Sequence, residues 1–190
     1  MGMTATDLAA GLFKVLETGD PVLADRVVHE EFHNREASVA PSACRIPGPA
    51  GVLASSAWMR SAFEDLRLPF LEAIHSDDQV WVRLRMRGRH SGAFVLYKDG
   101  ALDQVVPPTG REIDFEQIHV LDLRDGKVVR HEAVRDDIAM LGQLGVFPPK
   151  PAVGMGMLAW KVTGRASRAA AEVTIKAAQA AQTAVDRPTG

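Results

Sequence analysis

Several residue types and patterns are rare or missing in the sequence, and each absence excludes a class of protein. It contains one cysteine, Cys44, in 190 residues. An intrachain disulfide and a multi-cysteine metal cluster are therefore both excluded. No stretch approaches the roughly 20 apolar residues that a membrane helix needs, and the first residues lack the basic start and apolar run of a signal peptide. We therefore expect a protein of the cytoplasm, without a membrane partner.

An excess of charge of either sign is also missing. Lys and Arg number 22 against 24 Asp and Glu, which gives a formal net charge of -2. Phosphate binding needs a concentrated basic face, so nucleic acid is not an expected partner. The hydrophobic share of 46% is that of an ordinary globular protein. A chain of this length forms one core and has residues to spare.

Those spare residues lie at the C-terminus, where the composition changes. Residues 151–190 contain eleven alanines, five Lys or Arg and two Asp or Glu. Alanine and valine recur at helical spacing from Ala166 to Ala184, which predicts a helix with a stripe of small residues. Such a helix gains stability only by packing closely on its own domain or on a partner subunit; a loosely attached tail is the alternative. We place one domain at residues 1–148 and a helical extension at 149–190.

Within the first 148 residues, helical periodicity comes first and strand alternation follows. The predicted helices cover residues 5–18, 22–32 and 49–66, with a turn-rich loop before the third. The predicted strands begin at Val80, Ala93, Ile113 and Lys127, and residues 98–110 are expected to form a long turn. Asp125-Gly126 indicates a hairpin, and a closing helix is expected from Asp137 to Leu144. This order indicates an α+β fold, with helices packed on one face of a curved antiparallel sheet.

One strand carries polar residues on an apolar face. Its odd-numbered residues are Ile113, Phe115, Gln117, His119 and Leu121. An amide and an imidazole two residues apart share one wall, and each costs roughly 1–3 kcal/mol if it is buried without a partner. The two side chains are either a hydrogen-bonded pair in the core or part of a small-molecule pocket. Histidine suits proton transfer near neutral pH.

Other titratable residues favour structural roles. Glu132 is expected to pair with an arginine, for which the alternating Arg83, Arg85, Arg87 and Arg89 are candidates. Asp136 and Asp137 stand where a helix begins, so capping is expected of them. His29 and His33 have helical spacing for a metal, but no third ligand is evident, and we predict no metal site and no cofactor. Nucleophilic catalysis by Cys44 needs a neighbouring base, and Cys44 lies in a proline-rich loop, so it is not an expected nucleophile.

Several segments together resemble the SnoaL-like polyketide cyclases, a branch of the nuclear transport factor 2-like superfamily. The resemblance spans roughly residues 5 to 147 and rests on an ordered set of segments: Gly19-Asp20, Phe32-His33-Asn34, Met59 to Leu66, Gly88 to Gly92, Pro107 to Arg111, Asp125 to Glu132 and Leu141 to Gly145. It implies a cone-shaped α+β barrel, in which a bent antiparallel sheet wraps around N-terminal helices and encloses a deep apolar pocket. It also implies a homodimer or higher homo-oligomer.

The resemblance further implies an ester cyclase that closes a polyketide ring by aldol chemistry, without metal or cofactor. The family's orienting asparagine, glutamine and histidine fall on Asn34, Gln117 and His119. We therefore expect His119 to be the acid/base and Gln117 and Asn34 to orient the substrate. The side chains expected to contact a polyketide-like small molecule are His90, His131, Trp58, Phe63 and Phe115.

The sequence departs from the family at the position of its catalytic aspartate. That residue comes two places after the histidine of the last strand, and here the stretch reads His131-Glu132-Ala133. Alanine transfers no proton, and a shift of one residue along a strand points Glu132 to the opposite face unless a bulge re-aims it. Three hypotheses follow: an enzyme that uses His119, a small-molecule-binding protein that has lost catalysis, and an assembly role for the Ala-rich segment.

Overall fold

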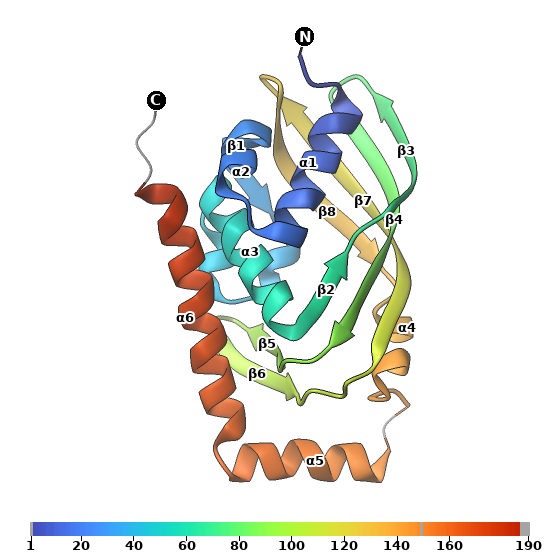
Figure 1. Ribbon diagram of the computed structural model, residues 1–190, viewed down its shortest axis with the longest axis vertical. Helices are drawn as coiled ribbons and strands as arrows, with labels where there is room; N and C mark the ends of the chain where they lie inside the picture. Colours follow the sequence, from blue (N-terminus) through green and yellow to red (C-terminus); the bar gives the residue numbers. More distant parts are fainter. Residues whose placement is uncertain (1, 149, 187–190) are drawn as a thin grey trace.

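The computed structural model describes residues 2–148 and 150–186, and Figure 1 shows the course of the chain. The elements in chain order are α1 (Ala5–Thr18), α2 (Pro21–Val27), β1 (Val28–Asn34), the 3-10 helices η1 (Arg35–Val39) and η2 (Ser42–Arg45), α3 (Pro49–Ala62), β2 (Phe63–Arg67), β3 (Phe70–Ser76), β4 (Gln79–His90), β5 (Phe94–Lys98), β6 (Ala101–Val106), β7 (Glu112–Arg124), β8 (Lys127–Arg135), α4 (Asp137–Leu144), α5 (Pro151–Val162) and α6 (Arg165–Val185). None of the described helices is both long and apolar enough to cross a bilayer.

Local sequence signals set the ends of the helices. Thr4 caps α1 through a reciprocal capping box with Asp7, and Gly19 ends that helix in the left-handed conformation. Asp136 caps α4 by accepting a hydrogen bond from the backbone of Ala139 at 2.9 Å, which confirms the capping role expected of it. The closing helix ends at Gly145, as predicted.

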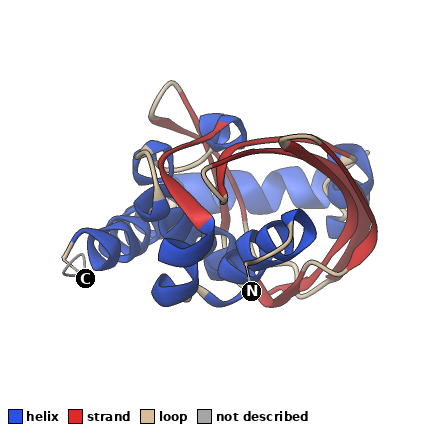
Figure 2. Cartoon of the chain, turned by 90° about the horizontal axis from the view of Figure 1, so that it is seen from above, coloured by secondary structure: helices blue, strands red, loops and turns tan. Residues whose placement is uncertain are grey.

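The main sheet is strongly curved, and α1 and α3 pack in its concave face (Figure 1). Its strand order is β1-β8-β7-β4-β2, with β3 also paired to β4, while β5 and β6 form a separate two-stranded sheet. Seen from above, the strands curl around the helices (Figure 2). This arrangement confirms the predicted α+β barrel, with one difference: β1 pairs with β8 in parallel, so the sheet is not wholly antiparallel.

Three of the predicted elements are wrong in extent. The second helix ends at Val27, and residues 28–34 form β1 because the β-branched Val27 and Val28 lead into an edge strand beside β8. The third helix ends at Ala62, and residues 63–67 form β2, which pairs with β4. The expected long turn contains strand β6, joined to β5 through Asp99-Gly100, both with positive φ.

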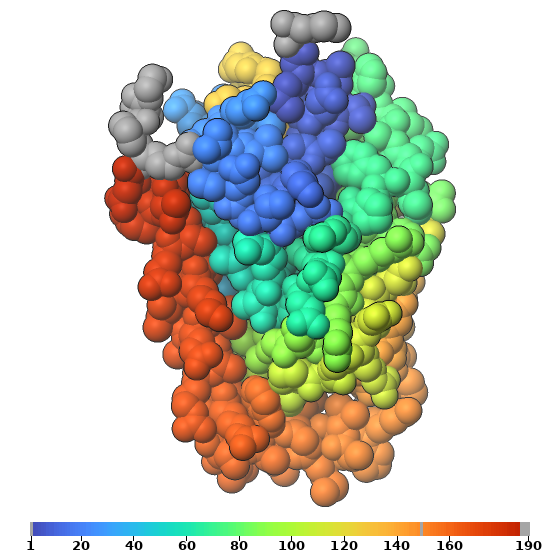
Figure 3. Space-filling view, in the orientation of Figure 1, coloured from blue at the N-terminus to red at the C-terminus, as the bar shows by residue number. Residues whose placement is uncertain are grey.

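The C-terminal helices extend the fold beyond the sheet. In Figure 1, α5 crosses below the β5–β6 hairpin and α6 runs along the side of α3; the space-filling view shows α6 as a continuous band on the body (Figure 3). Ala170, Val173, Ala177 and Ala181 of the small-residue stripe are buried. The hydroxyl of Tyr97 on β5 donates to the Ala170 carbonyl at 3.2 Å. These contacts hold α6 against the domain.

Candidate active site

A row of four polar side chains crosses the inside of the curved sheet. His119 on β7 lies between Gln117 and His131: its Nε2 is 2.8 Å from Oε1 of Gln117, and its Nδ1 is 2.7 Å from Nε2 of His131 on β8. At the other end, Nδ1 of His131 is 3.1 Å from Oδ1 of Asn34 at the end of β1. The structure therefore brings together all three predicted catalytic residues and adds His131 between two of them.

The position of these side chains follows from strand alternation. Ile113, Phe115, Gln117, His119 and Leu121 are all buried on the inner face of β7, as the sequence predicts. β8 is paired with β7 so that Leu121 lies opposite His131 and His119 opposite Ala133. Because residues two apart on a strand share a face, His131 and Ala133 point to the same side as His119.

The row can hold three protons, which is one more than two neutral imidazoles carry. The Asn34 oxygen is fixed as an acceptor because it already accepts from the backbone N–H of Glu36 at 3.0 Å. If the Gln117 oxygen also accepts, the three bonds of the row need three protons, whereas two neutral histidines supply two. A neutral row is satisfied when the Gln117 amide turns and donates to the lone pair on Nε2 of His119. The row can thus take up a proton at His119 and return it.

Burial keeps both histidines neutral at rest. Desolvation lowers the pKa of His131 to about 4 and the pKa of His119 well below its usual range. Arg135, and His131 when it is protonated, further lower the pKa of His119. The ring of Phe13 lies edge-on to His119, with 4.8 Å between ring centroids. The row is a buried, uncharged network at neutral pH.

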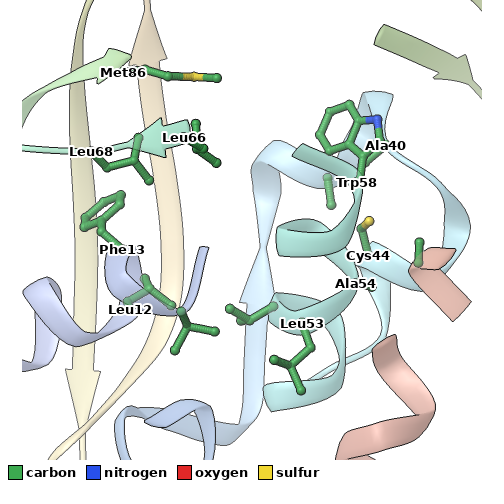
Figure 4. Packing of buried hydrophobic residues seen from close by; sticks show 14 of the residues in the cluster. Leu12, Phe13, Ala40, Cys44, Leu53, Ala54, Trp58, Leu66, Leu68 and Met86 are labelled. Atoms are coloured by element: carbon green, nitrogen blue, oxygen red, sulfur yellow. The ribbon is translucent and has the colours of Figure 1, made fainter. Parts of the chain in front are cut away.

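This row forms one wall of an apolar cavity, which we call the histidine cavity. Its volume is about 80 Å³. Its lining combines the polar row with apolar and charged side chains from α1, η1, α3 and the strands: Phe13, Leu16, Asn34, Glu36, Ala37, Ser55, Trp58, Met59, Leu66, Leu68, Met86, Gln117, His119, His131 and Arg135. Figure 4 shows Phe13, Leu66, Leu68 and Met86 on one side and Trp58 on α3 on the other.

A neighbouring cavity of about 180 Å³ continues from the first. The two share Trp58, Met59, Met86, Gln117 and Arg135 in their walls. Of the predicted substrate contacts, His131 lines the histidine cavity, Phe115 lines the neighbouring cavity, and Trp58 lines both. The Trp58 indole N–H donates to the Val95 carbonyl at 2.9 Å, which fixes the ring.

Two predicted substrate contacts, His90 and Phe63, lie elsewhere. Neither lines either cavity among the described residues. His90 is fully buried: Nδ1 accepts from the backbone N–H of Thr109 at 3.3 Å, and the ring lies against Phe63 with centroids 5.4 Å apart. Both side chains belong to the core between β2 and β4, and alternation on a strand does not distinguish a core position from a cavity position. Their contact with a substrate stays a prediction that neither cavity lining supports.

The structure also settles the direction of Glu132. Its carboxylate accepts from Arg35 at 2.8 Å and lies 3.3 Å from Nε of Arg130, on the outer face of the sheet. The hydrogen bond from Arg35 lowers the pKa of Glu132. The expected pairing of Glu132 with an arginine is thus confirmed, but its partners are not the arginines that the sequence suggested. Arg83 pairs with Glu116 and Arg85 pairs with Asp114 instead.

Two charged residues of the cavity wall were missed by the sequence reasoning. Glu36 on η1 accepts from the backbone N–H of Ala133 at 3.0 Å, so a carboxylate stands beside the alanine. Arg135 continues the inner face of β8, and its Nη1 is 3.1 Å from Oε2 of Glu36. Extending the alternation of His131 and Ala133 by two residues would have found Arg135. A 3-10 helix brings in Glu36, and no sequence pattern indicated it.

Other reactive groups do not join the site. Burial raises the pKa of the Cys44 thiol to about 12, so it stays protonated and unreactive. Among the described residues, no three His, Cys, Asp or Glu side chains come together in a group that could hold a metal ion. The chemistry that the site offers is proton transfer and hydrogen bonding in a cavity with a partly apolar lining.

The buried histidines predict a loss of stability in mild acid. His90 and His131 have a pKa of about 4 in the folded chain, against roughly 6.5 when unfolded. Because the folded pKa is depressed, their contribution is complete above pH ~6.5 and falls as the pH drops towards ~4. Each should add ~1.4 kcal/mol per pH unit to the decline of the unfolding free energy. Urea unfolding at several pH values should show His90→Leu with a shallower slope; an unchanged slope would contradict this. His75→Gln, at an exposed position, is the matched control.

Comparison with known proteins places this geometry in context. Residues 6–144 match the family described as SnoaL-like polyketide cyclase. The chain is 30% identical over 151 residues to aklanonic acid methyl ester cyclase DnrD of Streptomyces peucetius, covering 78% of this chain and 95% of that protein. It is 31% identical over 150 residues to aklanonic acid methyl ester cyclase DauD of Streptomyces sp. strain C5, covering 76% and 84%. The structure of TsrD from Streptomyces laurentii superposes with a TM-score of 0.60 at 23% identity, covering 75% and 95%.

Proposed function

Because the chain belongs to the SnoaL-like polyketide cyclase family, we propose that it closes a ring in a polyketide-like methyl ester by intramolecular aldol addition, without metal or cofactor. The observation that carries this proposal is the row Asn34–His131–His119–Gln117 along an apolar cavity, because it can accept and return one proton. Aldol cyclisation needs that capacity and no other co-reactant.

In the proposed reaction, His119 takes a proton from an activated carbon of the substrate. The resulting enolate carbon attacks a ketone of the same molecule and forms the new carbon–carbon bond. The ketone's π electron pair moves to its oxygen, which then receives the proton back from the row. Gln117 and Asn34 orient the row and the substrate. Trp58 and Phe115 supply apolar surface for the rings.

A second candidate function is small-molecule binding without catalysis, and Ala133 is the observation that favours it. Alanine at this position faces His119 across the β7–β8 pair, where a carboxylate would reach the row. The structure thus has a formed cavity beside a position that cannot itself transfer a proton. The two functions differ in whether the natural chain turns substrate over.

The experiment compares the wild-type chain with Ala133→Asp on aklanonic acid methyl ester, the substrate class named for the relatives. We expect wild-type turnover well above the protein-free rate, with the product followed by chromatography. Turnover by Ala133→Asp alone would favour the binding function. Ala178→Asp, on the exposed side of α6, is the matched control for the added charge.

A further inference from the structure

Arg135 stands where the two cavities meet. It lies directly opposite Gln117 in the β7–β8 register, on the inner face that also carries His131. Directly opposed side chains in an antiparallel pair have Cβ atoms roughly 4.5–5.5 Å apart. Arg135 lines both cavities, and among the described residues of the two linings it is the one Lys or Arg.

Two carboxylates hold the guanidinium in place. Its Nη1 is 3.1 Å from Oε2 of Glu36 and its Nε is 3.4 Å from Oδ1 of Asp137. Glu36 is itself anchored by the backbone N–H of Ala133. A guanidinium has five N–H donors. Its two ion pairs use Nη1 and Nε, so they leave the N–H groups of Nη2 for another acceptor. The cation is therefore fixed in direction and still has donors to offer.

The rest of the site cannot neutralise a negative charge on the substrate. Both histidines are neutral at rest, and the Gln117 amide is a dipole without net charge. An enolate oxygen forming in the cavity would lie beside the guanidinium of Arg135, whose charge Glu36 and Asp137 partly balance. Fixed charges and donors aimed at a developing oxyanion are among the largest contributions to catalysis in a site that excludes water.

We propose that Arg135 binds the substrate carbonyl oxygen that becomes the enolate oxygen, and that the ligand class is a 1,3-dicarbonyl compound. The proposal rests on the proposed function and assigns it a catalytic cation. No atom is lost in the step: the carbon-bound proton passes to His119, the C–H electron pair becomes the enolate, and its charge lies at the oxygen beside Arg135. Glu36 and Asp137 are positioning residues that hold the guanidinium.

The test uses acetylacetone, a small 1,3-diketone whose enolate absorbs in the near ultraviolet. Difference spectra over a pH series, at increasing protein concentration, give the apparent pKa of the bound diketone. We expect the wild-type chain to lower that pKa by about one unit or more, the size of shift that a close opposite charge produces. Arg135→Gln should abolish the shift, and Arg135→Lys should retain part of it.

Arg130→Gln is the matched control, since Arg130 lies on the outer face of the same strand beside Asp122 and Glu132. It should keep the full wild-type shift. No shift with the wild type, or an equal shift with Arg135→Gln, would overturn the proposal. Circular dichroism establishes that each variant is folded, and Arg135→Lys keeps the test decisive if Arg135→Gln does not fold. If the wild-type chain lowers the pKa of bound acetylacetone but does not turn the ester over, the oxyanion site is supported and the cyclase function is wrong.

Discussion

Replacing His119 with alanine should lower the turnover number for aklanonic acid methyl ester by about 10²–10⁴-fold, the usual contribution of a general acid or base. The substitution removes the imidazole that joins Gln117 to His131, and with it the site at which the row accepts a proton. Michaelis constants should change much less, because the apolar walls remain. Initial rates over a range of ester concentrations measure both quantities.

Two comparisons separate loss of chemistry from loss of structure. His75→Ala removes an exposed histidine of β3 and should retain wild-type turnover. Added imidazole should restore part of the rate of His119→Ala, because the substitution leaves a hole of the missing ring's shape. If His119→Ala turns the ester over at the wild-type rate, His119 is not the proton-transfer group.

Replacing Phe13 with alanine should lower the free energy of unfolding by about 3–5 kcal/mol, as expected for truncating a buried aromatic ring. Phe13 on α1 is 2% exposed and makes edge contacts with Phe70, His119 and His131. Its removal joins an empty volume to the histidine cavity and takes away the packing that holds the two imidazoles. Urea unfolding followed by circular dichroism measures the change.

The matched substitution is Val134→Ala, at a residue that is 75% exposed on the outer face of β8. Its unfolding free energy should stay within about 0.5 kcal/mol of the wild-type value. Phe13→Leu should fall between the two, because leucine refills most of the space. A loss below about 1 kcal/mol for Phe13→Ala would mean that α1 does not pack on the row as described.

Strand alternation carried most of what the sequence could predict. It placed Gln117 and His119 side by side on the inner face of β7, and the hairpin at Asp125-Gly126 then aligned β8 with them. The breaker at Gly19 located the end of α1, and the cap at Asp136 located the start of α4. Each of these signals lies within a short stretch of residues, so one sequence is enough to recognise it.

The features that the sequence did not predict depend on contacts between distant segments. β1 and β2 are short strands that form because they pair with β8 and β4. Helical spacing in and before these segments predicted helices there instead. Glu36 reaches the site only because η1 returns the chain to Ala133. His90 and His119 both sit on inner strand faces, yet one lies in the core and the other in a cavity.

The folded structure places other polar groups around Ala133, where the family has its aspartate. The sequence shows only that Ala133 cannot transfer a proton. In the folded chain, the same neighbourhood contains a hydrogen-bonded histidine pair, a carboxylate at Glu36 and a fixed cation at Arg135. In the proposed function, these groups divide between them the proton transfer and the charge stabilisation that cyclisation requires.

The most direct test of this account is the number of product molecules that each wild-type chain forms. The protein is mixed with a large excess of aklanonic acid methyl ester, and the cyclised product is quantified against a protein-free control. We predict many turnovers per chain, with His119→Ala reduced at least about 100-fold. Tight binding of the ester with no product above the control would contradict the account and identify a binding protein.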